Sequence, residues 1–111
     1  MTEKQKEVCE RLDWSVTEYE KDGVVELEKY SPAGEDFIVS VDTGDFVENV
    51  KAYAANFDQD EHIEMWVEAK HNGGRGIPSI RELVQDAADI DKMLQELAIA
   101  LQEAEDREGV A

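Results

Sequence analysis

The strongest pattern in the chain is a run of apolar residues near the C-terminal end with the spacing of an α-helix. Successive members are three and four residues apart without interruption, so all of them fall on one face of a helix. Ser79 follows Pro78 and can form a capping box with Glu82, which predicts where the helix begins. We therefore predict one long amphipathic helix over residues 79–105, with an apolar face made of Ile80, Leu83, Ala87, Ile90, Leu94, Leu97, Leu101 and Ala104.

The first half of the chain alternates between apolar and polar residues, as β-strands with one buried face do. We predict strands over residues 14–20, 24–30 and 36–41. Gly23 lies in the first connection, Pro32 and Gly34 lie in the second, and both connections are short enough for tight turns. Two tight turns in succession predict an antiparallel meander, whose inward-facing residues are Trp14, Val16, Val25, Leu27, Phe37, Val39 and Val41.

Three shorter segments also have helical spacing. They cover residues 4–12, 45–56 and 58–70. Asp45 and Asp58 are the predicted N-caps of the second and third, because each precedes a helical pattern and has a glutamate three residues later. The predicted fold class is α+β: a three-stranded antiparallel meander with a short N-terminal helix, two short helices and one long C-terminal helix packed on the sheet. We expect a single domain over residues 1–111, with residues 1–3 and 107–111 frayed.

The composition adds a strong negative charge to this picture. The chain has 28 acidic and 11 basic residues, which gives a formal charge of −17. Self-repulsion on this scale costs stability, so the excess of acids needs a reason. The periodic apolar pattern argues against disorder. Two explanations stay open: the acids maintain solubility or reflect adaptation to salt, or they form an anionic surface that binds a cationic partner.

Charge and cysteine content also limit the function classes. No cluster of lysine and arginine exists, which disfavours direct binding to nucleic acid or to an anionic membrane. The N-terminal stretch is polar and no apolar run approaches membrane-spanning length. Cys9 is the single cysteine, so it cannot form an internal disulfide, and we expect it to be buried rather than reactive. These features predict a cytoplasmic protein.

The polar face of the long helix carries the clearest functional pattern. Glu82, Asp89, Glu96 and Glu103 recur every seven residues, and Asp86 lies between the first two. Seven residues span about 10.5 Å of helix, so these carboxylates form a straight ladder that can imitate a line of phosphates. The alternative is a solvated face with no partner. Further acids expected to contribute to a partner-binding surface are Glu18, Glu26, Glu28, Asp60 and Glu64.

The remaining candidate chemistry is weak. His62 lies among acidic sequence neighbours, but a zinc site usually includes a second histidine or a cysteine, and neither HExxH nor CxxC spacing is present. A glycine-rich segment at residues 73–76 precedes the long helix, yet it lacks a phosphate-loop GK[ST] motif and is better explained by chain reversal. We therefore expect no metal, no cofactor and no catalytic residue. A small metal-binding protein or enzyme centred on His62 is kept as an alternative.

The length of the C-terminal helix leaves the oligomeric state open. At about 1.5 Å per residue it extends for about 40 Å, which is longer than the small sheet and short helices are expected to cover. Its distal turns could then contact a second copy through Leu97, Ile99 and Leu101. This alternative describes a homodimer or an adaptor whose binding depends on apolar residues and not on carboxylates.

Two stretches of the sequence resemble those of known small acidic proteins. Residues 14–37, which include WSVTEYE and EKYSPAGEDF, and residues 62–69, HIEMWVEA, are similar to acidic open reading frames of phages and conjugative elements in Gram-positive gut bacteria. These proteins resemble antirestriction and anti-CRISPR accessory proteins, and the similarity covers about residues 13–104. The resemblance implies a non-enzymatic α+β protein that blocks a host nucleic-acid-handling protein by imitating DNA. It transfers no functional residue.

Overall fold

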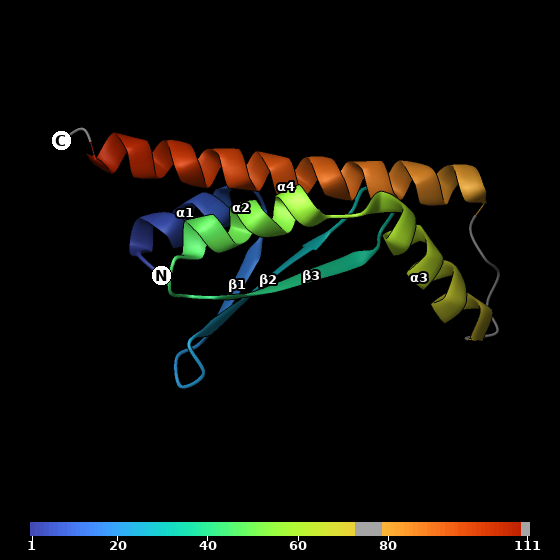
Figure 1. The fold of residues 1–111 in the computed structure, drawn as a ribbon, viewed down its shortest axis with the longest axis horizontal. Coiled ribbons are helices and arrows are strands. Elements are labelled where there is room, and N and C mark those ends of the chain that lie inside the picture. Colours follow the sequence, from blue (N-terminus) through green and yellow to red (C-terminus); the bar gives the residue numbers. More distant parts are fainter. Residues whose placement is uncertain (73–78, 110–111) are drawn as a thin grey trace.

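The computed structural model describes residues 1–72 and 79–109 and contains the predicted α+β fold. Three strands follow a short helix, and three helices follow the strands (Figure 1). The glycine-rich segment at residues 73–76 lies outside the described residues. The elements in chain order are α1 (Glu3–Arg11), β1 (Ser15–Tyr19), β2 (Val24–Tyr30), β3 (Asp36–Asp42), α2 (Phe46–Asn56), α3 (Gln59–Asn72) and α4 (Ile80–Gly109).

The sheet is the predicted antiparallel meander, with strand order β1-β2-β3. Val16 pairs with Leu27, and Leu27 pairs with Val39, so these three side chains share one face. The predicted inward set is confirmed: Val16 is half-buried against the core, and the other six residues of that set are buried. The alternation of apolar and polar residues therefore predicted which side chains face the core, because a shift by one residue would expose the whole set.

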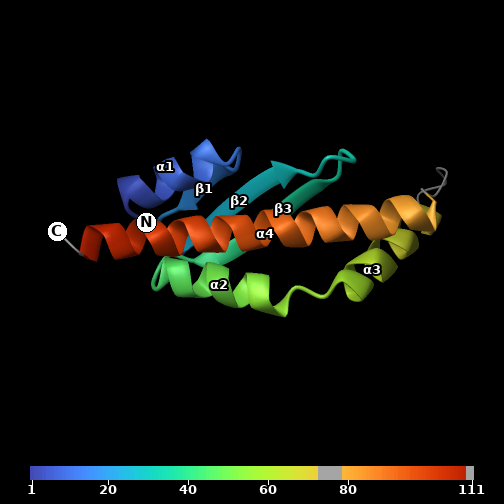
Figure 2. The ribbon, with the colours of Figure 1, turned by 90° about the horizontal axis from the view of Figure 1, so that it is seen from above.

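The helices cover one face of this sheet. Seen from above, α4 runs along the middle of the molecule with α1 on one side and α2 and α3 on the other (Figure 2). In Figure 1, α1, α2 and α4 lie above the sheet, and none of the described helices lies on its lower face. The side chains of Tyr19, Tyr30 and Ile38 are exposed. The core thus lies between the strands and α4.

The apolar face of α4 is buried over most of its length. Ile80 is exposed, and the predicted stripe is buried from Leu83 to Ala104. Leu97 and Leu101 are buried in the protein's own core, so their expected contact with a second copy is wrong. The helix was expected to extend beyond its neighbours, but α1 and α2 both pack against it. Of the three expected dimer contacts, only Ile99 is exposed.

The helix ends agree in part with the predicted caps. The side chains of Ser79 and Asp58 accept hydrogen bonds from the backbone N–H groups of Glu82 and Glu61 at 3.2 and 3.1 Å, as predicted. Asp45 has a φ of 56° and makes no side-chain cap hydrogen bond, so its predicted capping role is wrong. Asn49 instead donates to two backbone carbonyls before α2, which ties the helix to the end of β3.

The two chain ends and Cys9 complete the comparison with the sequence. Thr2, in the segment expected to fray, caps α1 through a capping box. At the other end α4 continues to Gly109. Cys9 is fully buried, as predicted, and burial raises the pKa of its thiol to about 12. The helical spacing of residues 58–70 predicts that Trp66 faces inward, but the side chain of Trp66 lies outside the described residues.

Candidate functional site

The first candidate site is the row of carboxylates on α4, which we call the α4 ladder and define as Glu82, Asp89, Glu96 and Glu103. Glu82, Glu96 and Glu103 are exposed, and Asp89 is half-buried. Asp89 accepts a hydrogen bond from Gln85 at 3.0 Å. No member of the α4 ladder forms an ion pair within the described residues. These carboxylates are therefore held on one helix without an ion-pair partner among the described residues.

Asp86 does not belong to this exposed row. Its side chain is fully buried, so its expected place on a partner-binding surface is wrong. At about 100° per residue, Asp86 lies about 60° from Leu83 around the helix, within the buried face. It also lies seven residues before Met93, which is buried too. An acid on the apolar face was the sequence signal that could have identified it.

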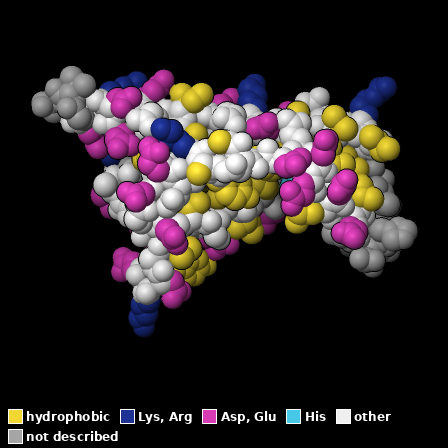
Figure 3. All heavy atoms as spheres, in the orientation of Figure 1, with side chains coloured by type: hydrophobic (Ala, Val, Ile, Leu, Met, Phe, Trp, Pro, Cys, Tyr) yellow, Lys and Arg dark blue, Asp and Glu magenta, His cyan; other side chains and the backbone are white. Residues whose placement is uncertain are grey.

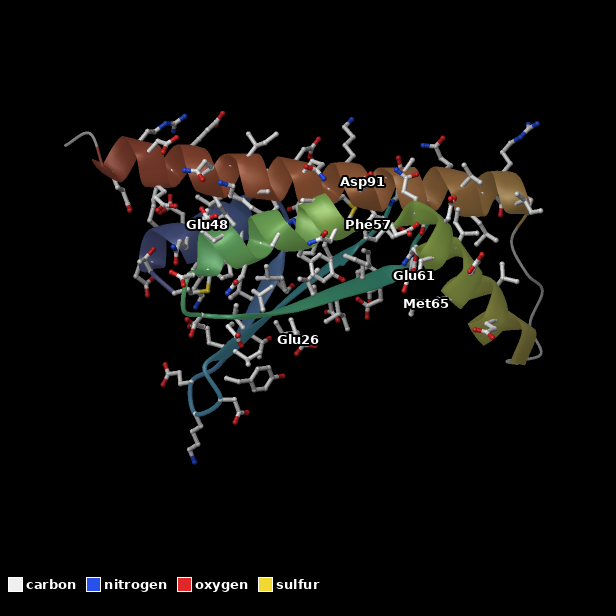
Figure 4. All side chains as sticks on the ribbon, viewed as in Figure 1. Glu26, Glu48, Phe57, Glu61, Met65 and Asp91 are labelled. Atoms are coloured by element: carbon white, nitrogen blue, oxygen red, sulfur yellow. The ribbon has the colours of Figure 1, made fainter. Side chains whose placement is uncertain are left out.

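The secondary acids are spread over different faces. Glu18 lies 3.8 Å from the amino group of Met1 and pairs with Val25, on the core side of the sheet. Glu26 lies on the opposite side of the sheet, away from α4 (Figure 4), and its carboxylate accepts a hydrogen bond from Tyr19 at 2.9 Å. Glu28 belongs to the same outer face, where the nearby Asp36 raises its pKa. The sheet acids therefore do not extend the α4 ladder.

The acids at the start of α3 form a separate group. Asp60 and Glu64 are exposed, as predicted. A shallow depression lined by Asp58, Asp60 and Asp91 joins α3 to α4. Figure 3 shows acidic side chains at both ends of the visible face, with a dense group near the junction of α3 and α4 and mainly hydrophobic and uncharged atoms in the middle. The anionic surface thus has one ordered row on α4 and one local group beside it.

The second candidate site is buried, and we call it the carboxylate–histidine cluster: Glu35, His62 and Asp86. Each residue comes from a different element, namely the turn before β3, the start of α3 and the start of α4. One potential ligand atom from each residue lies within 4.8 Å of the other two. Nε2 of His62 lies 3.0 Å from Oε2 of Glu35, to which it can donate a hydrogen bond. Asp86 is fully buried, and Glu35 and His62 are each partly buried.

The turn between β2 and β3 positions this cluster. Gly34 has a φ of 91°, and its N–H donates to the carbonyl of Ser31 at 2.8 Å. The hydroxyl of Ser31 accepts a hydrogen bond from the N–H of Glu35 at 3.1 Å and donates its own proton to Oδ1 of Asp86. Ser31 is itself buried. The turn therefore fixes the backbone at Glu35 and the orientation of Asp86 together.

Aromatic rings hold the histidine. The ring centroid of His62 lies 5.8 Å from that of Phe37 and 5.5 Å from that of Phe57. His62 also lines an open groove of about 840 Å³ between β3, α2 and α3. Glu61 and Met65, labelled in Figure 4, line the same groove beside the start of β3. One edge of the cluster is therefore adjacent to a surface that a small molecule or ion can reach.

The electrostatics of the cluster follow from two carboxyl groups that meet in a buried place. Burial, together with the adjacent carboxyl group of Glu35, raises the pKa of Asp86 to about 6. The hydrogen bond to Glu35 raises the pKa of His62. Oδ2 of Asp86 has no hydrogen-bond partner among the described residues. The cluster therefore favours an extra positive charge, carried by a proton or by a cation.

The sequence suggests His62 and its acidic sequence neighbours as an alternative metal site. The structure instead places His62 next to Glu35 and Asp86. These partners lie 27 residues before it and 24 residues after it. No short motif marks such a set.

Comparisons with protein-family models, with curated proteins and with solved structures found no match to this chain. Among the described helices, none has an apolar stretch long enough to cross a membrane.

Proposed function

We propose that this chain is a non-enzymatic acidic protein that binds a cationic protein, most plainly one whose own ligand is nucleic acid. In this proposal the α4 ladder and the acids at the start of α3 take the place of nucleic-acid phosphates. The observation that carries it is the lack of internal compensation. Within the described residues, the ion pairs involve Glu18, Glu48 and Glu35, and none involves the α4 ladder.

The shape of the molecule supports this reading. Its principal extents are 52 × 28 × 22 Å, and α4 lies along the long axis. A formal charge of −17 over 52 Å corresponds to one charge per ~3 Å, close to the spacing of about 3.4 Å along one strand of DNA. From Glu82 to Glu103 the ladder spans about 31 Å of helix. An extended basic channel could therefore contact several of these carboxylates at once.

The main competing function, an adaptor that binds through apolar residues of α4, has less support. Leu97 and Leu101 are buried within the protein. The exposed apolar residues of α4 are Ile80, Val84 and Ile99, and the last lies 15 residues, or about 22 Å, beyond Val84. Single exposed apolar residues are ordinary on protein surfaces. The described part of α4 thus offers no continuous apolar strip.

The resemblance to antirestriction-type proteins of mobile elements stays a prediction, and it suggests where to look for the partner. The experiment is affinity capture on the immobilised full chain from a lysate of a Gram-positive gut bacterium, followed by elution with duplex DNA. We expect DNA and moderate salt each to release the captured protein, because both compete with charge–charge contacts. Retention in both eluants would refute occupation of a nucleic-acid site.

Two quadruple variants separate an ordered row from simple net charge. The first replaces the α4 ladder, as Glu82→Gln, Asp89→Asn, Glu96→Gln and Glu103→Gln. The control removes the same number of charges from exposed acids at the sheet side, as Glu20→Gln, Asp22→Asn, Asp36→Asn and Asp42→Asn. We expect the ladder variant to lose capture while circular dichroism stays unchanged, and the control to retain it. Equal loss in both variants would contradict a role for the row.

Replacing Lys92 should change partner binding in the direction opposite to replacing the carboxylates. It is exposed and lies three residues after Asp89 and four residues before Glu96, on the ladder side of α4. Within the described residues it forms no ion pair. We expect Lys92→Gln to strengthen partner binding and to increase its salt dependence, because it removes the one cation inside the row. Weaker binding would show that Lys92, and not the carboxylates around it, makes the contact.

A further inference from the structure

We propose that Glu35, His62 and Asp86 form a binding site for one divalent transition-metal cation of the zinc type. The site is independent of the α4 ladder. Two carboxylates and one imidazole converge from three elements, and their potential ligand atoms lie within 4.8 Å of one another. Imidazole nitrogen and carboxylate oxygen are both common ligands of Zn²⁺.

The unpartnered oxygen of Asp86 points to a ligand. Asp86 is fully buried, Oδ1 receives the Ser31 hydroxyl hydrogen bond, and Oδ2 has no hydrogen-bond partner among the described residues. A buried carboxylate oxygen without a donor is costly. The N–H of His62 can be directed to Glu35, so it does not serve Oδ2. A cation between the three groups would satisfy Oδ2.

The spacing suits a small cation after a modest adjustment. Zinc–nitrogen and zinc–oxygen bonds of about 2.1 Å place the ligands of a tetrahedral site about 3.4 Å apart. The distance from Nε2 of His62 to Oε2 of Glu35 is 3.0 Å, and the other pairs lie within 4.8 Å. Side-chain rotations at Glu35, which is only partly buried, can supply the difference.

Neighbouring residues hold the three potential ligands in place, as they do in metal sites. Ligands in such sites are oriented by hydrogen bonds from neighbouring groups. Here Ser31 orients Asp86, and the rings of Phe37 and Phe57 hold His62. Three protein ligands leave a fourth position for water or another small ligand. His62 also lines the groove, which gives that position a route to solvent.

The ligand set also favours one class of cation. Ca²⁺ is usually held by six to eight oxygens and Mg²⁺ by oxygens in a strict octahedron. A set of one nitrogen and two carboxylates, of which only Asp86 is fully buried, matches neither preference and suits the transition-metal series. We therefore choose Zn²⁺ for affinity measurements and Co²⁺ as a spectroscopic probe of the coordination geometry.

The test is a titration of the chelator-treated full chain with Zn²⁺ by calorimetry, in a large excess of Mg²⁺ to occupy the many surface carboxylates. We expect one equivalent to bind and to raise the melting temperature. Glu35→Gln, His62→Gln and Asp86→Asn should each weaken binding by at least about ten-fold. Co²⁺ should give visible absorption bands of a four- or five-coordinate site.

The matched control removes the acids that surround His62 in the sequence, as Asp58→Asn, Asp60→Asn and Glu64→Gln. We expect this variant to keep one tight equivalent of Zn²⁺. Circular dichroism and urea unfolding verify that the cluster variants are folded, so that lost binding reports lost ligands. Zn²⁺ binding that disappears in Mg²⁺, or that survives all three cluster substitutions, overturns the proposal. In that case a proton, not a metal, lies between Glu35 and Asp86.

Discussion

Replacing Asp86 by asparagine tests how much the buried carboxylate costs the folded protein when no metal is present. Asparagine has the shape of aspartate, so its Oδ1 can still accept the hydrogen bond from Ser31. Its amide N–H groups come to lie where Oδ2 of Asp86 has no hydrogen-bond partner among the described residues. The substitution thus removes one buried charge, adds donors beside Glu35 and opens no cavity.

The magnitude follows from the pKa of Asp86. Burial and the adjacent Glu35 raise this pKa from 3.8 to about 6, and one pKa unit corresponds to about 1.4 kcal/mol. Ionising Asp86 in the folded protein therefore costs up to about 3 kcal/mol of the free energy of unfolding. The folded state holds the proton more tightly than the unfolded state. The cost is consequently absent below the unfolded pKa and fully present above about 6.

Like Asp86, His62 makes the folded protein less stable as the pH rises. Its hydrogen bond to Glu35 raises its pKa above 6.5, so the folded state gains stability from the protonated imidazole at low pH. That contribution is fully present below 6.5 and is lost as the pH rises through the higher folded value. Both groups therefore predict that the metal-free protein becomes less stable between about pH 4 and about pH 8.

The assay is urea unfolding of wild type and Asp86→Asn with a chelator, at about pH 4 and about pH 8. We expect the variant to be more stable than wild type by up to about 3 kcal/mol at the higher pH and close to wild type at the lower pH. Asp89→Asn removes the same charge from a half-buried position on the same helix, and controls for general repulsion. Destabilisation of Asp86→Asn at the higher pH, or a gain equal to that of Asp89→Asn, would refute the reasoning.

Three further predictions test the fold. Leu97→Ala should lower the free energy of unfolding by about 2–5 kcal/mol, because the leucine side chain is buried. Ile99→Ala should lower it by less than about 0.5 kcal/mol, because the isoleucine side chain is exposed. Equal effects in urea unfolding would contradict the packing of α4. The thiol of Cys9 should react with an alkylating reagent only as fast as the protein opens, since burial raises its pKa to about 12; rapid alkylation of the folded protein at neutral pH would contradict this. Gly34→Ala should lower the free energy of unfolding by about 1 kcal/mol, because φ is +91° and alanine is strained there. No described atom lies within 4 Å of the added Cβ, so no clash adds to this cost. Calorimetric melting that matches wild type would show that the turn adopts another conformation.

Errors in the sequence-based predictions have identifiable physical causes. Asp45 has the residue type and spacing of an N-cap, but it adopts a left-handed conformation and Asn49 makes the local hydrogen bonds instead. A contact of Leu97 and Leu101 with a second copy was one of the alternatives, because the predicted helix exceeds the expected width of the sheet. The neighbouring helices α1 and α2 pack against α4 and bury that length within the chain itself.

The sequence by itself determined the element types, the inward-facing residues of the strands and the buried face of α4. All three follow from periodicities of two and 3.6 residues, and these depend on neighbours close in the chain. The charged row on α4 followed from the same arithmetic. Its members stay on one face of the helix wherever that helix packs.

Only the tertiary structure decided which acids meet. Asp86 appeared to belong with the α4 ladder, but the packing of α4 turns it inward to Glu35 and His62. The turn between β2 and β3 supplies Ser31 and Glu35, and α3 supplies His62. Contacts across such separations depend on how the sheet and helices dock, which no local pattern specifies. The desolvation that changes the chemistry of Asp86 therefore arises only when the chain is folded.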